Sequence, residues 1–131
     1  AEVITSYSKQ FPIKDHLQLG YEQQAKLFKL IRKNTGRIPP VVDAKDILLN
    51  PKKQLTKLCQ KAGIKFKGSM ISWPMGSRES DGVWATYWYQ EVNNSCGFKP
   101  YIERKTQILK RHEHILRKCI KSYEFLYYYK I

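Results

Sequence analysis

The chain has 131 residues and a net charge of +13, because 24 Lys and Arg side chains outnumber 11 Asp and Glu side chains. Its hydrophobic fraction of 42%, with 3 Trp, 9 Tyr and 5 Phe, excludes a disordered chain and favours one folded domain. No run of about eighteen apolar residues is present, so we expect neither a membrane-spanning helix nor a membrane partner. No secretory leader is recognisable either.

The positive charge favours anionic partners, such as nucleotides, nucleic acid or sulfated substrates. An equally good interpretation is biased composition, in which scattered Lys side chains coat a solvated surface. Net charge bears on association and not on fold, so by itself it does not choose between these alternatives.

Three cysteines, Cys59, Cys96 and Cys119, are an odd number and lie far apart. No Cys-x-x-Cys pair occurs, so neither a disulfide framework nor a zinc site is favoured. His112 and Cys119 share one face of a predicted helix, but two possible ligands do not make a metal site. We therefore predict no metal, and reduced thiols in a cytoplasmic protein.

The spacing of apolar residues predicts two helices in the first part of the chain. Residues 2–10 form a short helix, which Phe11-Pro12 interrupts. Residues 20–34 form a longer helix, in which apolar side chains recur at helical spacing and Gly36 stands at the C-terminal cap.

A proline pair ends that part, and residues 41–44, Val-Val-Asp-Ala, predict a short buried strand. Asp43 at its carboxyl end either faces a ligand or caps the next helix, and the cap is favoured. Asn50 is a good N-cap and Pro51 a good first helical residue, so a helix is predicted over residues 51–62.

The rest of the chain is predicted to be loop and helix. Trp84, Trp88 and Val92 recur every four residues, which favours a helix despite the aromatic content. The further predicted elements are a helix over 44–49, a loop over 64–81, a helix over 82–94 and a helix over 103–128. The segment is thus mainly α-helical with one short strand. Because a lone strand lacks partners for its backbone groups, other strands lie in ambiguous segments or the sheet lies outside this chain.

The most specific feature is the sequence Asp-Gly-Val-Trp-Ala-Thr-Tyr-Trp-Tyr over residues 81–89, closed by Gly97-Phe98. Large aromatic side chains are costly to leave in water, so we expect a packed aromatic cluster with structural roles for Trp84 and Trp88. The block follows a loop over residues 72–78 that mixes turn-forming residues with a cation, Arg78.

Together with this block, other segments resemble the C-terminal half of the P-loop sulfotransferase family. The resemblance is to its bacterial and plant group, whose sequences carry a C-terminal Asp-Gly-Val-Trp-Ala-x-x-Trp-Tyr block. The matching segments are 2–7, 40–51, 72–98 and 119–127. The resemblance implies an α/β fold with a parallel sheet, in which residues 1–131 form a single C-terminal portion and the P-loop half is absent.

The resemblance also implies a binding site for the donor 3′-phosphoadenosine 5′-phosphosulfate. Family members hold its 3′-phosphate through an Arg and a Ser, and Ser6 matches that Ser. Arg78 falls near the family's second cation for this phosphate, although the Gly and Asp that follow stand in exchanged order. A helix N-terminus beside a strand end would add free N–H groups. Alternatively, Ser6 is a helix-surface residue and Arg78 a solvated loop side chain.

Enzymes of this family transfer a sulfuryl group to a hydroxyl or amine acceptor. This sequence contains no Gly-x-x-x-x-Gly-Lys-Ser/Thr motif, and the family's usual base has no counterpart in His16, His112 or His114. By itself the chain is therefore expected to be inactive. It is interpreted as a fragment, or as a subunit that associates with itself or docks to a separate P-loop half.

A function of another class is a non-catalytic basic helical module that binds nucleic acid or a partner protein. The charge and the aromatic content favour this alternative. However, no signature of an RRM, KH or zinc-finger domain is present, and the aromatic residues follow the spacing of a helix core. Nucleic acid is therefore the less favoured partner.

Overall fold

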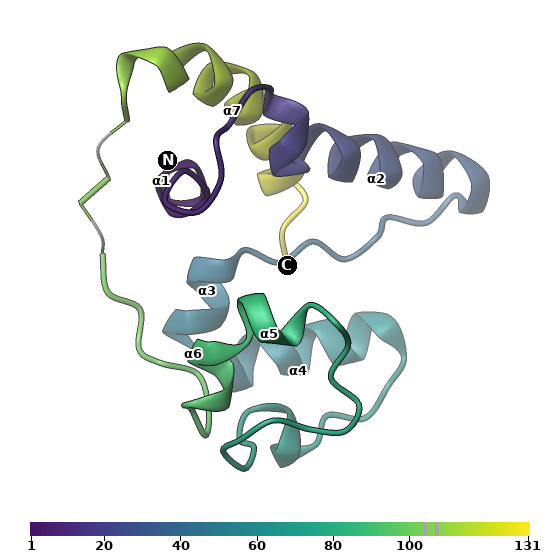
Figure 1. Ribbon diagram of the computed structural model, residues 1–131. Helices are drawn as coiled ribbons and strands as arrows, with labels where there is room; N and C mark the ends of the chain where they lie inside the picture. Colours follow the sequence, from purple (N-terminus) through teal and green to yellow (C-terminus); the bar gives the residue numbers. More distant parts are fainter. Residues whose placement is uncertain (104, 107) are drawn as a thin grey trace. The chain divides into compact units, whose positions relative to one another are not determined.

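A computed structural model describes residues 1–103, 105, 106 and 108–131 (Figure 1). The chain divides into two compact units, one formed by Ala1–Val41 with Ile102–Ile131 and the other by Val42–Tyr101. We call them the terminal unit and the central unit. Each has its own buried side chains and its own local hydrogen bonds.

The terminal unit is built from the two ends of the chain. Its elements are α1 (Glu2–Tyr7), α2 (Tyr21–Thr35), α7 (Glu113–Tyr127) and the 3-10 helices η1 (His16–Leu19) and η3 (Lys110–His112). Helix α7 packs against η1 and α2, which places the yellow end of the chain beside the purple one in Figure 1. Segments from opposite ends of the sequence therefore share one core.

Two clusters of buried apolar side chains hold this unit together. The first lies between the N-terminal segments and α7 and consists of Ile4, Ile13, Leu19, Ile115 and Cys119. The second joins α2 to α7 and consists of Ala25, Phe28 and Leu126. The Phe28 ring lies 5.5 Å from Phe125, edge to face, and 4.7 Å from Tyr129. Aromatic contacts thus close the second cluster.

The predicted helix over residues 20–34 is confirmed as α2. Gly20 and Gly36 flank it with φ of 75° and 67°, a left-handed conformation that glycine adopts without steric cost. The N–H of Gly36 donates to the carbonyl oxygen of Arg32 at 2.9 Å, which satisfies one of the last carbonyl groups of the helix. The helix predicted over 2–10 is shorter, because its last three residues form turns.

The central unit contains a pair of packed helices followed by a long irregular segment. Its elements are α3 (Ala44–Leu49), α4 (Pro51–Ala62), the 3-10 helix η2 (Gly68–Met70), α5 (Ala85–Trp88) and α6 (Gln90–Asn93). The Oδ1 atom of Asn50 accepts the N–H of Lys53 at 3.1 Å, and Gly63 ends α4 with φ of 70°. The predicted boundaries of this helix are confirmed.

Hydrogen bonds fasten the two ends of the irregular segment together. Ser72 and Gly97 form an antiparallel bridge, and the backbone N–H of Trp73 donates to Cys96 at 3.1 Å. The Trp73 indole N–H donates to Ser95 Oγ at 3.2 Å, and its ring packs edge to face on Phe98. A Cβ atom on Gly97 would lie 3.0 Å from the carbonyl oxygen of Ile71, so glycine permits this close approach.

The predicted parallel-sheet α/β fold is wrong for this chain, because the described residues form helices and contain no strand. The predicted strand over 41–44 is reduced to one parallel bridge between Val41 and Lys130. The preceding prolines, Pro39 and Pro40, have no N–H to extend a ladder. On the other side Asp43 already caps α3, since its Oδ1 atom accepts the N–H of Lys45 at 2.9 Å.

Two other predicted helices differ from the structure. The helix over 82–94 is divided into α5 and α6 at Tyr89, whose φ of −97° and ψ of 5° leave the helical region. Aromatic and β-branched residues are weak helix formers, so they hold a helix poorly without tertiary packing. The helix predicted over 103–128 begins at Glu113, after a 3-10 turn. Its part at residues 104 and 107 lies outside the described residues.

Phe28 is the side chain by which the packing of α2 on α7 can be tested. It is 4% exposed, and we expect Phe28→Ala to lower the free energy of unfolding by about 3–5 kcal/mol. Leu27→Ala is the matched control, because Leu27 lies in the same helix and is 55% exposed. Urea unfolding measures both variants. Equal losses in the two would contradict the central place of Phe28.

Candidate functional site

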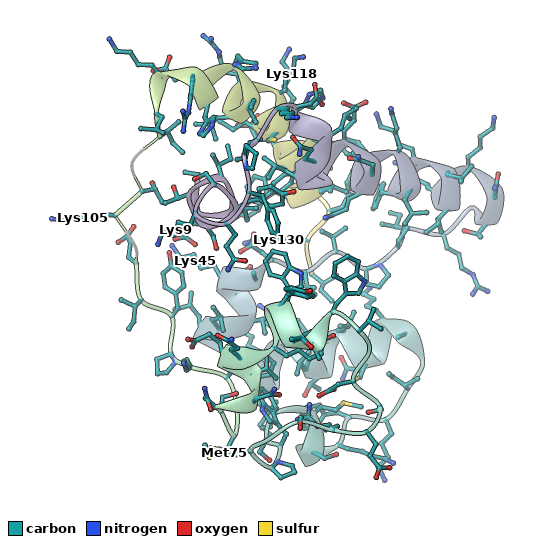
Figure 2. The ribbon with its side chains drawn as sticks, in the orientation of Figure 1. Lys9, Lys45, Met75, Lys105, Lys118 and Lys130 are labelled. Carbon is teal, nitrogen blue, oxygen red and sulfur yellow. The ribbon has the colours of Figure 1, made fainter. Side chains whose placement is uncertain are left out.

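Ser6, the first predicted site residue, is exposed in the last turn of α1. No hydrogen bond in the described part of the chain engages its hydroxyl. The carbonyl oxygen of Ser6 accepts the N–H of Lys9 at 3.3 Å, which fixes Lys9 in the turn directly after the helix (Figure 2). A hydroxyl and an exposed cation are therefore close in sequence at one end of α1. The spacing of three residues between Ser6 and Lys9 could have indicated Lys9 from the sequence, but Lys9 was not predicted as a site residue.

The geometry of α1 corrects one part of the expected site. This helix has six residues, and its first turn carries Glu2. Ser6 lies near the other end, where the helix presents carbonyl groups rather than free N–H groups, and those carbonyl groups accept hydrogen bonds from residues 8–11. The negative end of the helix dipole also lies there, so α1 itself disfavours a phosphate beside Ser6. The attraction for an anion must come from cations such as Lys9.

Arg78, the second predicted site residue, is exposed in a turn that its own backbone helps to close. Its N–H donates to Asp81 Oδ2 at 2.9 Å, and the N–H of Asp81 donates to the Arg78 carbonyl at 3.0 Å. Within the described residues, the ion pairs involve His16, Lys26 and Lys99, and none involves Arg78. The Asp81 carboxylate thus holds the turn through the backbone and leaves the guanidinium to solvent or a ligand.

Ser6 and Arg78 lie in different units, Ser6 in the terminal unit and Arg78 in the central unit. Each is accessible where it stands, and each carries a group that binds phosphate well: a hydroxyl and a guanidinium. Asp43, by contrast, acts as the N-cap of α3, as the sequence favoured.

The aromatic block at residues 81–89 is not a buried cluster. Trp84 is 66% exposed and Trp88 is 45% exposed, so the expectation that both pack inside the fold is wrong. The helical spacing of the block is real over one turn, but the aromatic side chains of that turn stay exposed. The spacing of the aromatic residues therefore predicted the helical turn, but it did not predict that the side chains of this turn are exposed.

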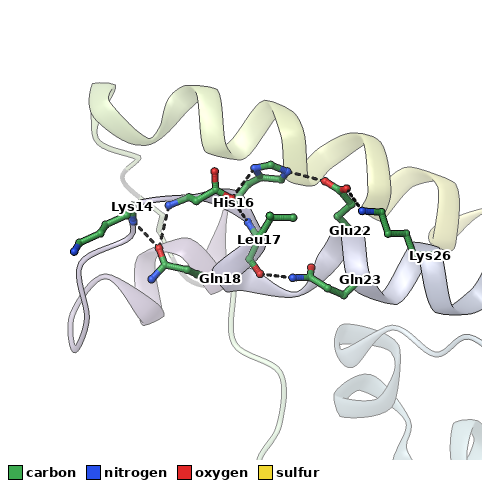
Figure 3. A network of polar contacts seen from close by, with 8 residues as sticks. Lys14, His16, Leu17, Gln18, Glu22, Gln23 and Lys26 are labelled. Atoms are coloured by element: carbon green, nitrogen blue, oxygen red, sulfur yellow. Dashed lines mark hydrogen bonds and ion pairs between the residues drawn. The ribbon is translucent and has the colours of Figure 1, made fainter.

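A network of polar contacts joins η1 to the start of α2 (Figure 3). His16 is its centre, with Nε2 at 2.7 Å from Glu22 Oε2 and Nδ1 at 3.1 Å from Asp15 Oδ1. The second contact is close but lacks the geometry of a hydrogen bond. The His16 side chain is 14% exposed with both nitrogens facing carboxylates, so it holds the fold and is not presented to a substrate.

The network lowers the pKa of both carboxyl groups. For Asp15 the main cause of the lowered pKa is the hydrogen bond from the Leu17 N–H, with smaller effects of the His16 and Lys118 charges. For Glu22 the lowered pKa comes first from the hydrogen bond of Lys26, then from that of His16. These carboxylates therefore stay ionised to lower pH than ordinary surface acids.

The described residues contain no group of three or more His, Cys, Asp or Glu side chains placed to hold a metal ion. All three cysteines are free, with Cys59 and Cys119 buried and Cys96 exposed. Burial raises the pKa of the Cys119 thiol, which makes it a poor nucleophile. Within the described part of the chain, no helix combines the length and the apolar character needed to cross a membrane.

Comparison with known proteins gives one family and two relatives. The family described as a sulfotransferase domain matches residues 1–126. Branched-chain-amino-acid aminotransferase-like proteins 2 and 1 of Arabidopsis thaliana are 27% and 29% identical to the chain over 124 residues. The match covers 95% of this chain and 22% of each relative, so the chain spans about a fifth of the length of these curated relatives. No solved structure matches significantly.

The network around His16 predicts how stability depends on pH. The pKa values of Asp15 and Glu22 are lowered in the folded state. Both carboxylates therefore stabilise the fold at pH values above their ordinary pKa values of 3.8 and 4.5. That contribution is lost as the pH falls through the lower folded-state values. We expect the urea midpoint to fall below about pH 4.5, and Glu22→Gln to flatten this fall. Glu79→Gln, at an exposed acid outside the network, is the control; an equal flattening there would contradict the assignment.

Proposed function

We propose, because the chain belongs to the sulfotransferase domain family, that residues 1–131 form the C-terminal portion of such a domain and bind its nucleotide sulfate donor. The family match over residues 1–126 is the observation that carries the proposal. The names of the two relatives describe aminotransferase-like proteins. Those names refer to proteins about five times longer than the match, since it covers 22% of each, and they supply no activity for this segment.

The residues of the chain fit an anionic donor. Ser6 offers a hydroxyl, Lys9 an ammonium group and Arg78 a guanidinium, and all three side chains are exposed. A guanidinium binds phosphate through paired N–H groups, and a hydroxyl adds one hydrogen bond. We propose Ser6, in the terminal unit, and Arg78, in the central unit, as separate binding residues for the donor 3′-phosphoadenosine 5′-phosphosulfate, with Lys9 adding charge beside Ser6.

The donor, when bound, supplies the sulfuryl group for transfer to a hydroxyl or amine acceptor. The part of this chain is to bind and orient the nucleotide, since positioning and charge stabilisation dominate reactions of this kind. The sequence contains no glycine-rich phosphate-binding loop, and His16 is held between two carboxylates. We therefore propose that another polypeptide segment, a P-loop half to which this chain docks, provides that loop and the catalytic base.

Two consequences belong to the same proposal. The 131 residues alone are expected to bind 3′-phosphoadenosine 5′-phosphate, the product left by the donor, but not to transfer a sulfuryl group. Sulfuryl transfer by the purified chain would contradict the proposal that a P-loop half supplies the catalytic base. A reducing compartment, the cytoplasm, suits a chain whose three cysteines are free.

A thermal-shift titration with 3′-phosphoadenosine 5′-phosphate tests the donor site. A ligand at about 100 times its Kd stabilises the folded state by about 2.7 kcal/mol, which raises Tm by several degrees. Loss of a charged hydrogen bond costs about 1.5–3 kcal/mol, so we expect Arg78→Ala to weaken binding by about tenfold to a hundredfold. Ser6→Ala, with about 1 kcal/mol lost, weakens it by about fivefold.

The controls separate the 3′-phosphate from general attraction to a basic chain. Adenosine 5′-monophosphate lacks the 3′-phosphate, so its binding is expected to be insensitive to both variants. Arg37→Ala and Ser69→Ala change exposed residues of the same types elsewhere. The absence of any shift, or equal effects of the control variants, would overturn the assignment. Tighter binding of a single-stranded oligonucleotide with a steep salt dependence would favour the nucleic-acid alternative instead.

A further inference from the structure

The central unit presents several exposed apolar side chains on α5 and the turn before it. Val83 is 84% exposed, Trp84 66%, Tyr87 69% and Trp88 45%. The carbonyl oxygen of Trp84 accepts the N–H of both Tyr87 and Trp88 at 3.1 Å, so a single helical turn brings these aromatic side chains to one face. We call Val83, Trp84, Tyr87 and Trp88 the aromatic patch.

The size of the aromatic patch indicates a contact surface. A Trp or Tyr side chain buries about 150–250 Å², so at these exposures the patch covers roughly 400–500 Å². Patches of several hundred Å² on monomeric proteins are often functional. Trp and Tyr are also the residues that contribute most to binding at protein interfaces. The patch therefore favours a partner with an apolar surface of its own.

The absence of charge on the aromatic patch indicates what kind of partner it can bind. No charged residue occurs from Gly82 to Gln90, although the chain carries a net charge of +13. At the edges, Asp81 is bound to the Arg78 N–H, and Glu91 is paired with Lys99 at 2.6 Å. A neutral apolar surface has no charge with which to recognise an ionic partner such as nucleic acid or an anionic bilayer. A second copy can therefore approach this surface without repulsion from charges on the patch itself.

The exposed apolar side chains of α2, unlike those of the aromatic patch, lie among charged residues. Leu27 and Leu30 are both 55% exposed, but Lys26 and Lys33 lie in the same helix and are exposed too. Two copies meeting along that face would bring like charges together, which opposes association. The aromatic patch and the exposed apolar side chains of α2 are therefore not equivalent.

We propose that the aromatic patch is the contact between two copies of this chain, related by a twofold axis. In such a contact the same patch serves on both copies, so Tyr87 and Trp84 of one copy pack on the patch of the other. Two patches together bury roughly 800–1,000 Å², near the lower limit for a specific interface. An interface of this size is typical of a weak, transient dimer. This contact does not depend on the donor site.

Sedimentation equilibrium of the chain at low and high salt tests the dimer. At about 0.5 M salt the Debye length falls to about 4 Å, so repulsion between the two positive copies is screened. We therefore expect dimerisation to strengthen with salt, the opposite of the salt effect on nucleic-acid binding. A monomer at every concentration, or association that weakens as salt rises, would overturn the proposal.

Variants test whether the aromatic patch forms the contact. We expect Trp84→Ser with Tyr87→Ser to weaken the dimer by at least about tenfold. Leu27→Ser with Leu30→Ser removes as many exposed apolar side chains from α2 and is expected to leave the dimer unchanged. If the α2 pair abolishes association and the patch pair does not, the proposal is wrong. Circular dichroism checks that the helical content of each variant is retained.

Introducing a charge in place of Tyr87 gives a second test, which stays valid even if the serine variants lose structure. At 69% exposure, Tyr87 accepts either charge without a cost in folding. Tyr87→Lys and Tyr87→Glu are each expected to be monomeric, because the twofold axis places like charges together. A mixture of the two variants is expected to regain heterodimers. Failure of the mixture to associate, while each variant stays folded, would overturn a symmetric contact.

Discussion

The packing of α2 on α7 and on the residues directly after it is the contact on which the terminal unit depends. One hydrogen bond in it, from Arg32 to the Tyr129 hydroxyl, joins residues that are 97 positions apart. Closing so long a loop costs conformational entropy, which local helix formation does not recover. Burial of Phe28 and Leu126, which are 4% and 8% exposed, supplies the favourable free energy. Without that contact, the cluster around Ile4 and Ile115 would be the remaining core shared by the two ends of the chain among the described residues.

Cations take part in the same contact. The Lys29 ammonium lies 4.7 Å from the centre of the Phe125 ring, and the Arg32 guanidinium lies 5.6 Å from that of Tyr129. Similar pairs join Lys130 to Tyr127 and Lys45 to Tyr101. Part of the positive charge therefore covers aromatic rings while keeping its head group in water. Net charge alone consequently overstates the surface available to an anionic ligand, and single exposed groups such as Arg78 are the better guide.

The sequence predicted features that depend on neighbours within a few residues. The caps at Gly36 and Asn50 are fixed by local φ angles and local hydrogen bonds, and both stand where predicted. The strand at Val41 depended on partners far along the chain, and its proline neighbours remove the donors that a ladder needs. Likewise, the spacing of Trp84 and Trp88 gives a helix face but not the element that covers it.

The candidate site residues show the same division. Ser6 and Arg78 came from a resemblance of ordered motifs, and the structure adds only that both are exposed. The helix-dipole argument for Ser6 failed because the length of α1 was not known: in a six-residue helix, one or two positions decide which end a side chain is near. Lys9 became a candidate residue for the same reason, because α1 ends at Tyr7 and Lys9 lies in the turn that follows.

The two units differ in how firmly they hold their candidate residues. Among the described residues of the central unit, Cys59 is the one apolar side chain that is fully buried, whereas two buried clusters support the terminal unit. The turn at Arg78 is consequently held by its own hydrogen bonds with Asp81 rather than by a core. Segments with few buried contacts open locally at low free-energy cost, and a ligand that orders them must offset that cost. In the proposed donor site, binding at Arg78 would therefore have to order its turn, whereas binding at Ser6 would use a position that the packing of Ile4 has already fixed.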